Sequence, residues 1–111
     1  EPRVVSAASQ APDRVTLGLD VGADCPWLEG HFPGQPVLPG VVQLRWAVQL
    51  AGLVWADLRT VTGVSNLKFQ NPVRPPAQLR LVLQRHRQTS RLDFSWHQGQ
   101  DRCATGRGSF E

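Results

Sequence analysis

Long apolar runs are missing from this chain of 111 residues. None approaches the length of about 18 residues that a transmembrane helix needs, so we expect no membrane span. The N-terminal residues also lack the basic-then-apolar order of a secretory signal peptide. These two absences predict a cytoplasmic protein.

Cysteine and lysine are also scarce. Cys25 and Cys103 lie far apart and form no CxxC or cysteine–histidine spacing, so the sequence predicts no metal site. We expect both thiols to be reduced, although two cysteines also suffice for one disulfide. Lys68 is the single lysine among twelve basic residues. A net charge of +3 without a long basic run argues against nucleic acid as a partner.

The remaining composition is that of a small globular domain. Hydrophobic residues make up 41% and charged residues 19% of the 12.3 kDa chain, which separates it from disordered proteins. A chain of this size buries roughly two-thirds of its unfolded surface, enough for one modest core. We therefore expect a single domain over residues 1–111, without internal repeats or linkers.

Hydrophobic periodicity predicts one helix among several strands. Alternating apolar residues indicate a half-buried strand at 14–21, and a glycine- and proline-rich loop follows at 22–39. Apolar residues at helical spacing predict a helix from Val41 to about Leu58, apolar on nearly all sides. Further strands are expected at 64–73, 78–87, 91–97 and 102–110, with a hairpin turn at 98–101. This order favours an α+β architecture, an antiparallel sheet wrapped around one helix.

Two residues at the junction of loop and helix have catalytic potential. His31 lies in the stiff loop, which can hold its imidazole in place as a general base. Gly40 opens the helix, where the amides are unpaired and the helix dipole is positive. A thioester carbonyl bound there would be polarised, and a developing enolate oxygen would be stabilised. The alternative is that the prolines only shape a turn and His31 is an ordinary surface residue.

The surrounding segment resembles the signature of the hotdog-fold 3-hydroxyacyl-ACP dehydratases of the FabZ and FabA type. Residues 31–36 read His-Phe-Pro-Gly-Gln-Pro, and Pro39-Gly40 follows at the start of the helix, as in that signature. Residues 67–76 are similar to the family's strand after the helix and its proline-containing turn. More loosely, residues 36–44 resemble the dehydratase-like proteins of aryl-polyene gene clusters.

This resemblance implies a hotdog dimer with a tunnel at its interface. The tunnel would receive an acyl chain on the phosphopantetheine of an acyl carrier protein or coenzyme A, without a metal or other cofactor. His31 would take the proton from C2, and the Gly40 amide would hold the thioester carbonyl. A helix acid from the other subunit, in a homodimer or a heterodimer, would protonate the leaving hydroxyl. The matching substrate-binding positions are Phe32, Pro33, Gly34, Pro39 and Gln49.

The chain departs from the family at that acid, because the position of the family's glutamate is occupied by Arg45. Arginine does not give up its proton at working pH. Dehydration then requires His31 to make both proton transfers, or a water held by Arg45 and Gln49. Alternatively, Arg45 binds an anionic group or is a plain surface charge, or the protein is an inactive carrier-binding or heteromeric partner.

Thioester hydrolysis is a second activity of the same fold. Hotdog thioesterases use a carboxylate, and the predicted helix carries none between Val41 and Ala56. Asp24 and Glu29 precede His31 and are the remaining candidates for this carboxylate. Asp57 lies too far along the helix to replace the family's glutamate.

Three further groups of residues carry weaker expectations. Trp46 and Trp55 are expected in the core or an interface. A group of arginines around one hairpin, Arg80, Arg85, Arg87 and Arg91, is either a solvated face or a carrier-docking patch. A helix this apolar cannot be covered by one small subunit, so a dimer is expected.

Overall fold

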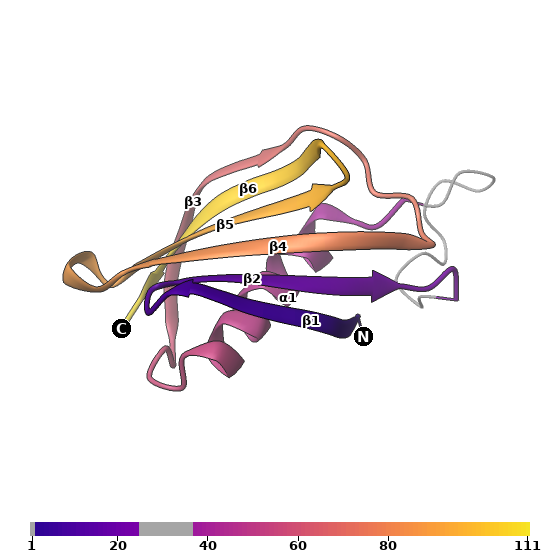
Figure 1. Ribbon diagram of the computed structural model, residues 1–111. Coiled ribbons are helices and arrows are strands. Elements are labelled where there is room, and N and C mark those ends of the chain that lie inside the picture. The colour runs from indigo at the N-terminus through magenta and orange to yellow at the C-terminus, as the bar shows by residue number, and fades with distance from the viewer. Residues whose placement is uncertain (1, 25–36) are drawn as a thin grey trace.

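One antiparallel sheet and one helix make up the fold. The computed structural model describes residues 2–24 and 37–111, and in this part of the chain six strands form a sheet with α1 along one face (Figure 1). The strand order is β1-β2-β4-β5-β6-β3. The elements are β1 (Arg3–Ala11), β2 (Arg14–Val21), α1 (Gly40–Val54), β3 (Val61–Phe69), β4 (Ala77–His86), the short 3₁₀ helix η2 (Arg87–Thr89), β5 (Arg91–Gln98) and β6 (Asp101–Phe110).

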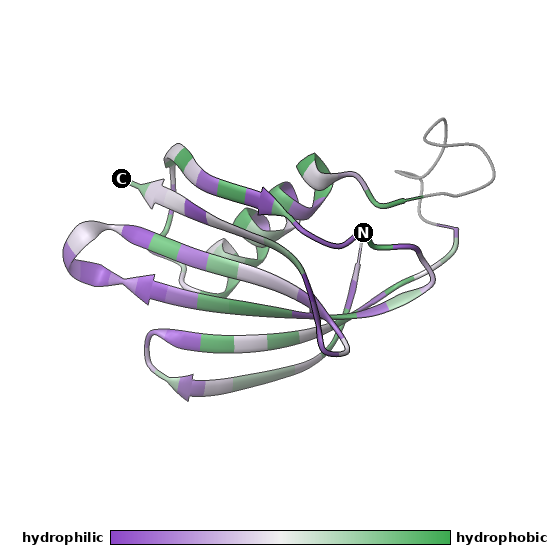
Figure 2. Cartoon of the chain, turned by 90° about the horizontal axis from the view of Figure 1, so that it is seen from above, coloured by the Kyte–Doolittle hydropathy of each residue, from purple (hydrophilic) through white to green (hydrophobic). Residues whose placement is uncertain are grey.

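The core lies between the sheet and α1. Strands β2, β4 and β5 alternate buried and more exposed residues, as their sequences predict (Figure 2). Apolar side chains such as Leu19 and Leu81 therefore face the helix, and polar side chains face away from it. The largest buried side chains are Trp46 on α1 and Trp96 on β5, and Trp55 is also buried. The α+β architecture and the core positions of both helix tryptophans are confirmed.

The helix ends earlier than its apolar pattern predicts. Val54 is its last residue, and Trp55 takes an extended conformation instead of continuing the helix to Leu58. The Trp55 indole N–H donates a hydrogen bond to the Pro12 carbonyl oxygen at 3.1 Å. This bond joins the end of α1 to the β1–β2 turn, so a tertiary contact fixes the helix end.

The N-terminal strand and the limits of β3 were not predicted correctly. Strand β1 is exposed along its whole length and consists largely of small and polar residues, so it lacks the alternation that marks a half-buried strand. Strand β3 covers Val61–Phe69 rather than 64–73. After β3, the amides of Gln70 and Asn71 both donate to the Cys103 carbonyl oxygen, which turns the chain out of the sheet.

Glycine at position 106 is required by close packing, which yields a stability prediction. A Cβ atom at Gly106 would lie 2.5 Å from Cζ of the buried Phe94 ring. Gly106→Ala is therefore expected to lower the free energy of unfolding by about 1–3 kcal/mol, because the core must shift. Gly63→Ala on β3 is the matched control, since no atom lies within 4 Å of its added Cβ. Urea unfolding of both variants checks the prediction, and equal stabilities would contradict it.

Candidate functional site

The N-terminus of α1 is held in place by a chain of hydrogen bonds. The Leu38 amide donates to the Val73 carbonyl oxygen at 2.8 Å, and Gln43 Nε2 donates to the Leu38 carbonyl oxygen at 3.2 Å. The Trp96 indole N–H donates to the Gln43 carbonyl oxygen at 2.9 Å. The first turn is thereby fixed to the sheet and to the segment before β4.

This helix terminus carries a positive partial charge that its own residues do not neutralise. Pro39 is the N-cap residue, and its carbonyl oxygen accepts from the amides of Val42 and Gln43 at 3.1 and 3.2 Å. The amides of Gly40 and Val41 precede any intrahelical acceptor. The first turn of α1 contains no acidic residue. An electronegative atom bound here would therefore meet helix amides that have no acceptor among the described residues, together with the positive end of the dipole.

A largely apolar pocket of about 540 Å³ lies at this terminus. Its walls come from the start of α1 and from the segment that follows β3. The lining residues are Val37, Leu38, Pro39, Gly40, Val41, Gln43, Phe69, Gln70, Asn71 and Pro72. Thus the structure brings the predicted residues Pro39 and Gly40 together in one pocket.

Gly40 is in close contact with an aromatic ring. A Cβ atom at this position would lie 2.5 Å from Cζ of Phe69. The Phe69 side chain is 52% exposed, so the ring covers Gly40 on one side and borders solvent on the other. Only glycine lets the ring and the helix backbone approach this closely, which narrows the pocket beside the free amides.

Gln43 is a residue of this site that the sequence reasoning missed. It is only 4% exposed, and its Oε1 atom has no hydrogen-bond partner among the described residues. Its Nε2 atom must face the Leu38 carbonyl oxygen, because only the NH₂ group of the amide donates. A polar residue on the apolar stripe that also holds Trp46 and Leu50 was the available signal.

Arg45 and Gln49 lie apart from this pocket. Both are exposed on α1, in the same stripe as Val41 and Leu53, and neither lines the pocket. A residue on this stripe faces away from the core of its own subunit. Arg45 is therefore not part of the wall of the pocket beside Gly40 in the same chain.

Several predicted residues fall outside the described part of the chain. These are the proposed base and its neighbours, His31, Phe32, Pro33 and Gly34, together with Glu29 and Cys25. Asp24 is described, is exposed and does not line the pocket at the start of α1.

Two other reactive groups are occupied or shielded. Arg85 forms hydrogen bonds to both carboxylate oxygens of Asp57, and these bonds lower the pKa of Asp57, so this acid stays ionised and does not supply protons. Cys103 has a free, buried thiol. Burial, followed by the charge of Asp101, raises its pKa and keeps it protonated. Neither residue suits catalysis at neutral pH.

Residues 2–24 and 37–111 contain no group of three or more histidine, cysteine, aspartate or glutamate side chains that could hold a metal ion. The helix found in the same ranges is too short to cross a bilayer.

Comparison with known proteins identifies the family. The model of the ApeI-like family, described as ApeI dehydratase, matches residues 7–107. Among curated proteins, the 3-hydroxyacyl-[acyl-carrier-protein] dehydratase FabZ of Verminephrobacter eiseniae is 38% identical over 80 residues, which cover 63% of this chain and 53% of that protein. The chain spans about half the length of the curated relatives it matches.

Solved structures share the whole architecture. A chain of the dehydratase heterocomplex ApeI:P from Xenorhabdus doucetiae superposes with a TM-score of 0.91 at 27% identity, over 98% of this chain and 96% of that one. An uncharacterised protein from Erwinia carotovora subsp. atroseptica gives a TM-score of 0.85 at 34% identity, over 100% and 96% of the two chains. The expected hotdog fold is confirmed.

Proposed function

Because this chain belongs to the ApeI-like family of dehydratases, we propose that it removes water from a 3-hydroxyacyl thioester carried by an acyl carrier protein or coenzyme A. The observation that carries this proposal is the pocket at the start of α1, where Gly40 leaves helix amides open to a ligand. Fatty-acid or polyene-type biosynthesis in the cytoplasm is the proposed setting. The reaction needs no cofactor, since the phosphopantetheine arm belongs to the substrate.

In the proposed mechanism, the thioester carbonyl binds at the Gly40 amide. The helix dipole and the amide withdraw electrons from the carbonyl, which acidifies C2. His31 takes the C2 proton, the freed electron pair forms the C2–C3 double bond, and the C3–oxygen bond breaks. The departing hydroxide takes a proton and leaves as water. Phe32, Pro33, Gly34, Pro39 and Gln49 would position the acyl chain and the pantetheine arm.

The proton for the leaving hydroxyl must come from a group other than Arg45. A guanidinium stays charged at neutral pH and donates hydrogen bonds without transferring protons. We propose that His31 returns its proton, or that another hotdog subunit supplies the acid at the shared interface. The second route is supported by the exposed position of Arg45 on α1 and by the similarity to a chain of the ApeI:P heterocomplex.

Hydrolysis of the thioester is less well supported. It requires a carboxylate near the carbonyl to activate water or to attack, and α1 contains no aspartate or glutamate. Asp24 does not line the described pocket. An inactive carrier-binding or partner subunit is the remaining alternative, and the first experiment below distinguishes it.

Dehydration should be visible by mass spectrometry. Purified protein incubated with a 3-hydroxyacyl carrier protein is expected to remove one water per acyl chain. His31→Ala should slow this reaction by about 10²–10⁴-fold, the usual loss on removing a general base. His97→Ala is the matched control, because His97 lies on a strand face away from the pocket and bonds to Ser95. Release of free carrier thiol would indicate a thioesterase, and unchanged substrate would indicate a binding role.

Restoring the acid tests the assignment of position 45. Arg45→Glu should accelerate dehydration by up to about 10²–10⁴-fold, because a carboxylic acid then stands where the family's glutamate does. Arg45→Gln removes the positive charge without adding an acid and should leave the rate low. If both variants accelerate the reaction equally, charge removal explains the gain and the assignment fails.

We also propose that the chain works as a dimer through one apolar side. Val41 and Leu53 on α1 are 71% and 81% exposed, and on β3 the residues Val64, Leu67 and Phe69 are exposed as well. Strand β3 is an edge strand, paired only with β6 in the described part of the chain. Unpaired edges and exposed apolar patches mark association surfaces. The Phe69–Gly40 contact places the pocket beside this edge.

Sedimentation equilibrium tests the dimer. We expect a mass of about twice the 12.3 kDa of one chain at micromolar concentration. Leu53→Glu should shift the protein toward monomers, because it places a charge in the apolar interface. Val5→Glu is the control, since Val5 is equally apolar and lies on β1 at the opposite edge. If the unmodified protein sediments only with the mass of one chain, the proposal is overturned.

A further inference from the structure

The sheet face that points away from α1 is strongly basic. Side chains on this face follow from the strand register, because residues paired across neighbouring strands share a face. Arg14 pairs with Gln84, Gln84 with Asp93, and Asp93 with Arg107. The charged residues on this outer face are Arg3, Arg14, Lys68, Arg80, Arg91, Arg102, Arg107, Asp20 and Asp93.

Charge is therefore distributed unevenly over the molecule. The outer face carries seven basic residues and two carboxylates, a formal charge of five positive, whereas the whole chain carries +3. The rest of the chain is accordingly net negative. A face with this excess of positive charge attracts acidic partners.

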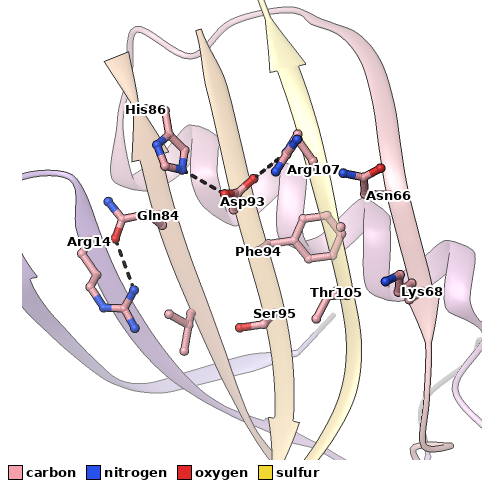
Figure 3. Close-up of a pocket in the computed structure, with 12 residues that line it drawn as sticks. Arg14, Asn66, Lys68, Gln84, His86, Asp93, Phe94, Ser95, Thr105 and Arg107 are labelled. Atoms are coloured by element: carbon pink, nitrogen blue, oxygen red, sulfur yellow. Dashed lines mark hydrogen bonds and ion pairs between the residues drawn. The ribbon is translucent and has the colours of Figure 1, made fainter. Parts of the chain in front are cut away.

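The carboxylates on this face are already neutralised by neighbours. Asp93 accepts hydrogen bonds from Arg107 Nε at 3.0 Å and His86 Nε2 at 2.9 Å (Figure 3). Arg91 Nε lies 3.6 Å from the same carboxylate. Although burial raises the pKa of Asp93, these hydrogen bonds outweigh it and hold the pKa below its usual range. Asp20 is paired with Arg3 at 3.3 Å.

Four other cations on this face have no such partner. No described carboxylate lies within 4.0 Å of Arg14, Lys68, Arg80 or Arg102, and Arg14 and Arg102 donate instead to the neutral side chains of Gln84 and Gln70. The pKa of His97 is lowered by burial and then by Arg80 and Arg102, which shows the positive potential at this end of the face.

The arginines singled out in the sequence behave differently. Arg85 and Arg87 are paired with Asp57 and Asp13, and Arg91 lies near Asp93. Of that group, only Arg80 keeps a charge that no described carboxylate offsets. Of the two interpretations of these arginines, the docking patch at the hairpin is thus largely neutralised, and the charge that no described carboxylate offsets lies on the outer face instead.

An open depression of about 620 Å³ with several charged side chains in its lining occupies the centre of this face (Figure 3). Arg14, Lys68 and Arg107 border it, and the hydroxyls of Ser95 and Thr105 lie between them. Arg14 on β2 and Lys68 on β3 are four strand spacings apart, about 19 Å along the sheet. One phosphate or carboxylate cannot reach both, so the occupant must carry several anionic groups on an extended surface.

We propose that this outer sheet face is a docking surface for an acidic protein partner. Arg14 and Lys68 contact carboxylates at the two sides of the depression, and hydroxyls between them accept and donate hydrogen bonds. A membrane is a poorer fit, because Val82 and Phe94 are the two large apolar residues in a lining that consists mostly of charged and hydrogen-bonding side chains.

The docking surface is separate from the proposed active site, and it borders the apolar side where Asn66 and Lys68 lie on β3. It lies on the opposite face of the sheet from α1, so a partner bound there leaves the Gly40 pocket accessible. The proposal therefore does not depend on dehydration, and its test measures binding rather than turnover.

Two double variants with equal charge change test the proposal. Fluorescence anisotropy follows binding of a labelled glutamate-rich peptide to the unmodified chain, to Arg14→Gln/Lys68→Gln and to Arg59→Gln/Arg74→Gln. Arg59 and Arg74 are exposed and lie off the face. We expect about a tenfold loss of affinity for the first variant at low salt. The control variant should lose only the small part of the affinity that depends on the net charge of the whole chain. Equal losses of affinity for the two variants would overturn the proposal.

Amide chemical-shift mapping gives a second, variant-free measurement. Titration of the unmodified chain with the same peptide should shift the amides around Ser95 and Thr105 and leave those of α1 unchanged. Shifts confined to α1 would overturn the proposal, even if the peptide binds. Tighter binding of an oligonucleotide of equal length, or of phosphatidylglycerol vesicles, at physiological salt would assign the face to a nucleic acid or a membrane instead.

Discussion

The position of the helix N-terminus depends on one short chain of buried hydrogen bonds. Trp96 on β5 donates to the Gln43 carbonyl, the Gln43 side chain donates to the Leu38 carbonyl, and Leu38 donates to Val73. These bonds connect the sheet, the first turn of α1 and the segment leading into it. Because the groups are buried, breaking one bond leaves an unpaired polar atom, which typically costs 1–3 kcal/mol, about as much as a core substitution. The geometry of the Gly40 pocket follows from this anchor.

The same sheet separates the molecule into surfaces with different physical properties. The face toward α1 is apolar and forms the core, whereas the opposite face is polar and positively charged. At the β3 edge, apolar side chains of α1 and β3 are exposed together. Strand alternation produces the first two surfaces directly, since neighbouring residues point to opposite faces. The third arises because one helix cannot be covered on all sides by a single curved sheet.

Local patterns made most of the fold predictable from the sequence. Strand β2 has the predicted limits, the helix begins at the Pro39-Gly40 pair, and both helix tryptophans are buried. The errors occur where tertiary contacts decide. Trp55 ends the helix by bonding to the β1–β2 turn, and β1 has no buried side to reveal it.

The candidate site was predictable only in part. Its glycine and the helix opening follow from a motif, and the structure places both in one pocket. Gln43 was missed because its role depends on two tertiary contacts that no sequence pattern reveals. One is with Trp96, which lies far away in the sequence, and the other is with the backbone carbonyl of Leu38. The basic outer face was missed for a related reason. Its residues come from all six strands of the described sheet, and only the register brings them to one side of the sheet.

Arginine at the acid position separates two requirements of the proposed reaction. Formation of an enolate needs a base and a positive environment for the carbonyl oxygen, and in the proposed mechanism the Gly40 end of α1 would provide the second of these. Departure of the hydroxyl needs a proton donor, which a guanidinium is not. A helix without a carboxylate therefore supports the first half of the chemistry but not the second. The missing proton must come from the base itself or from outside this chain, and the exposed stripe that holds Arg45 is the side on which another subunit would approach.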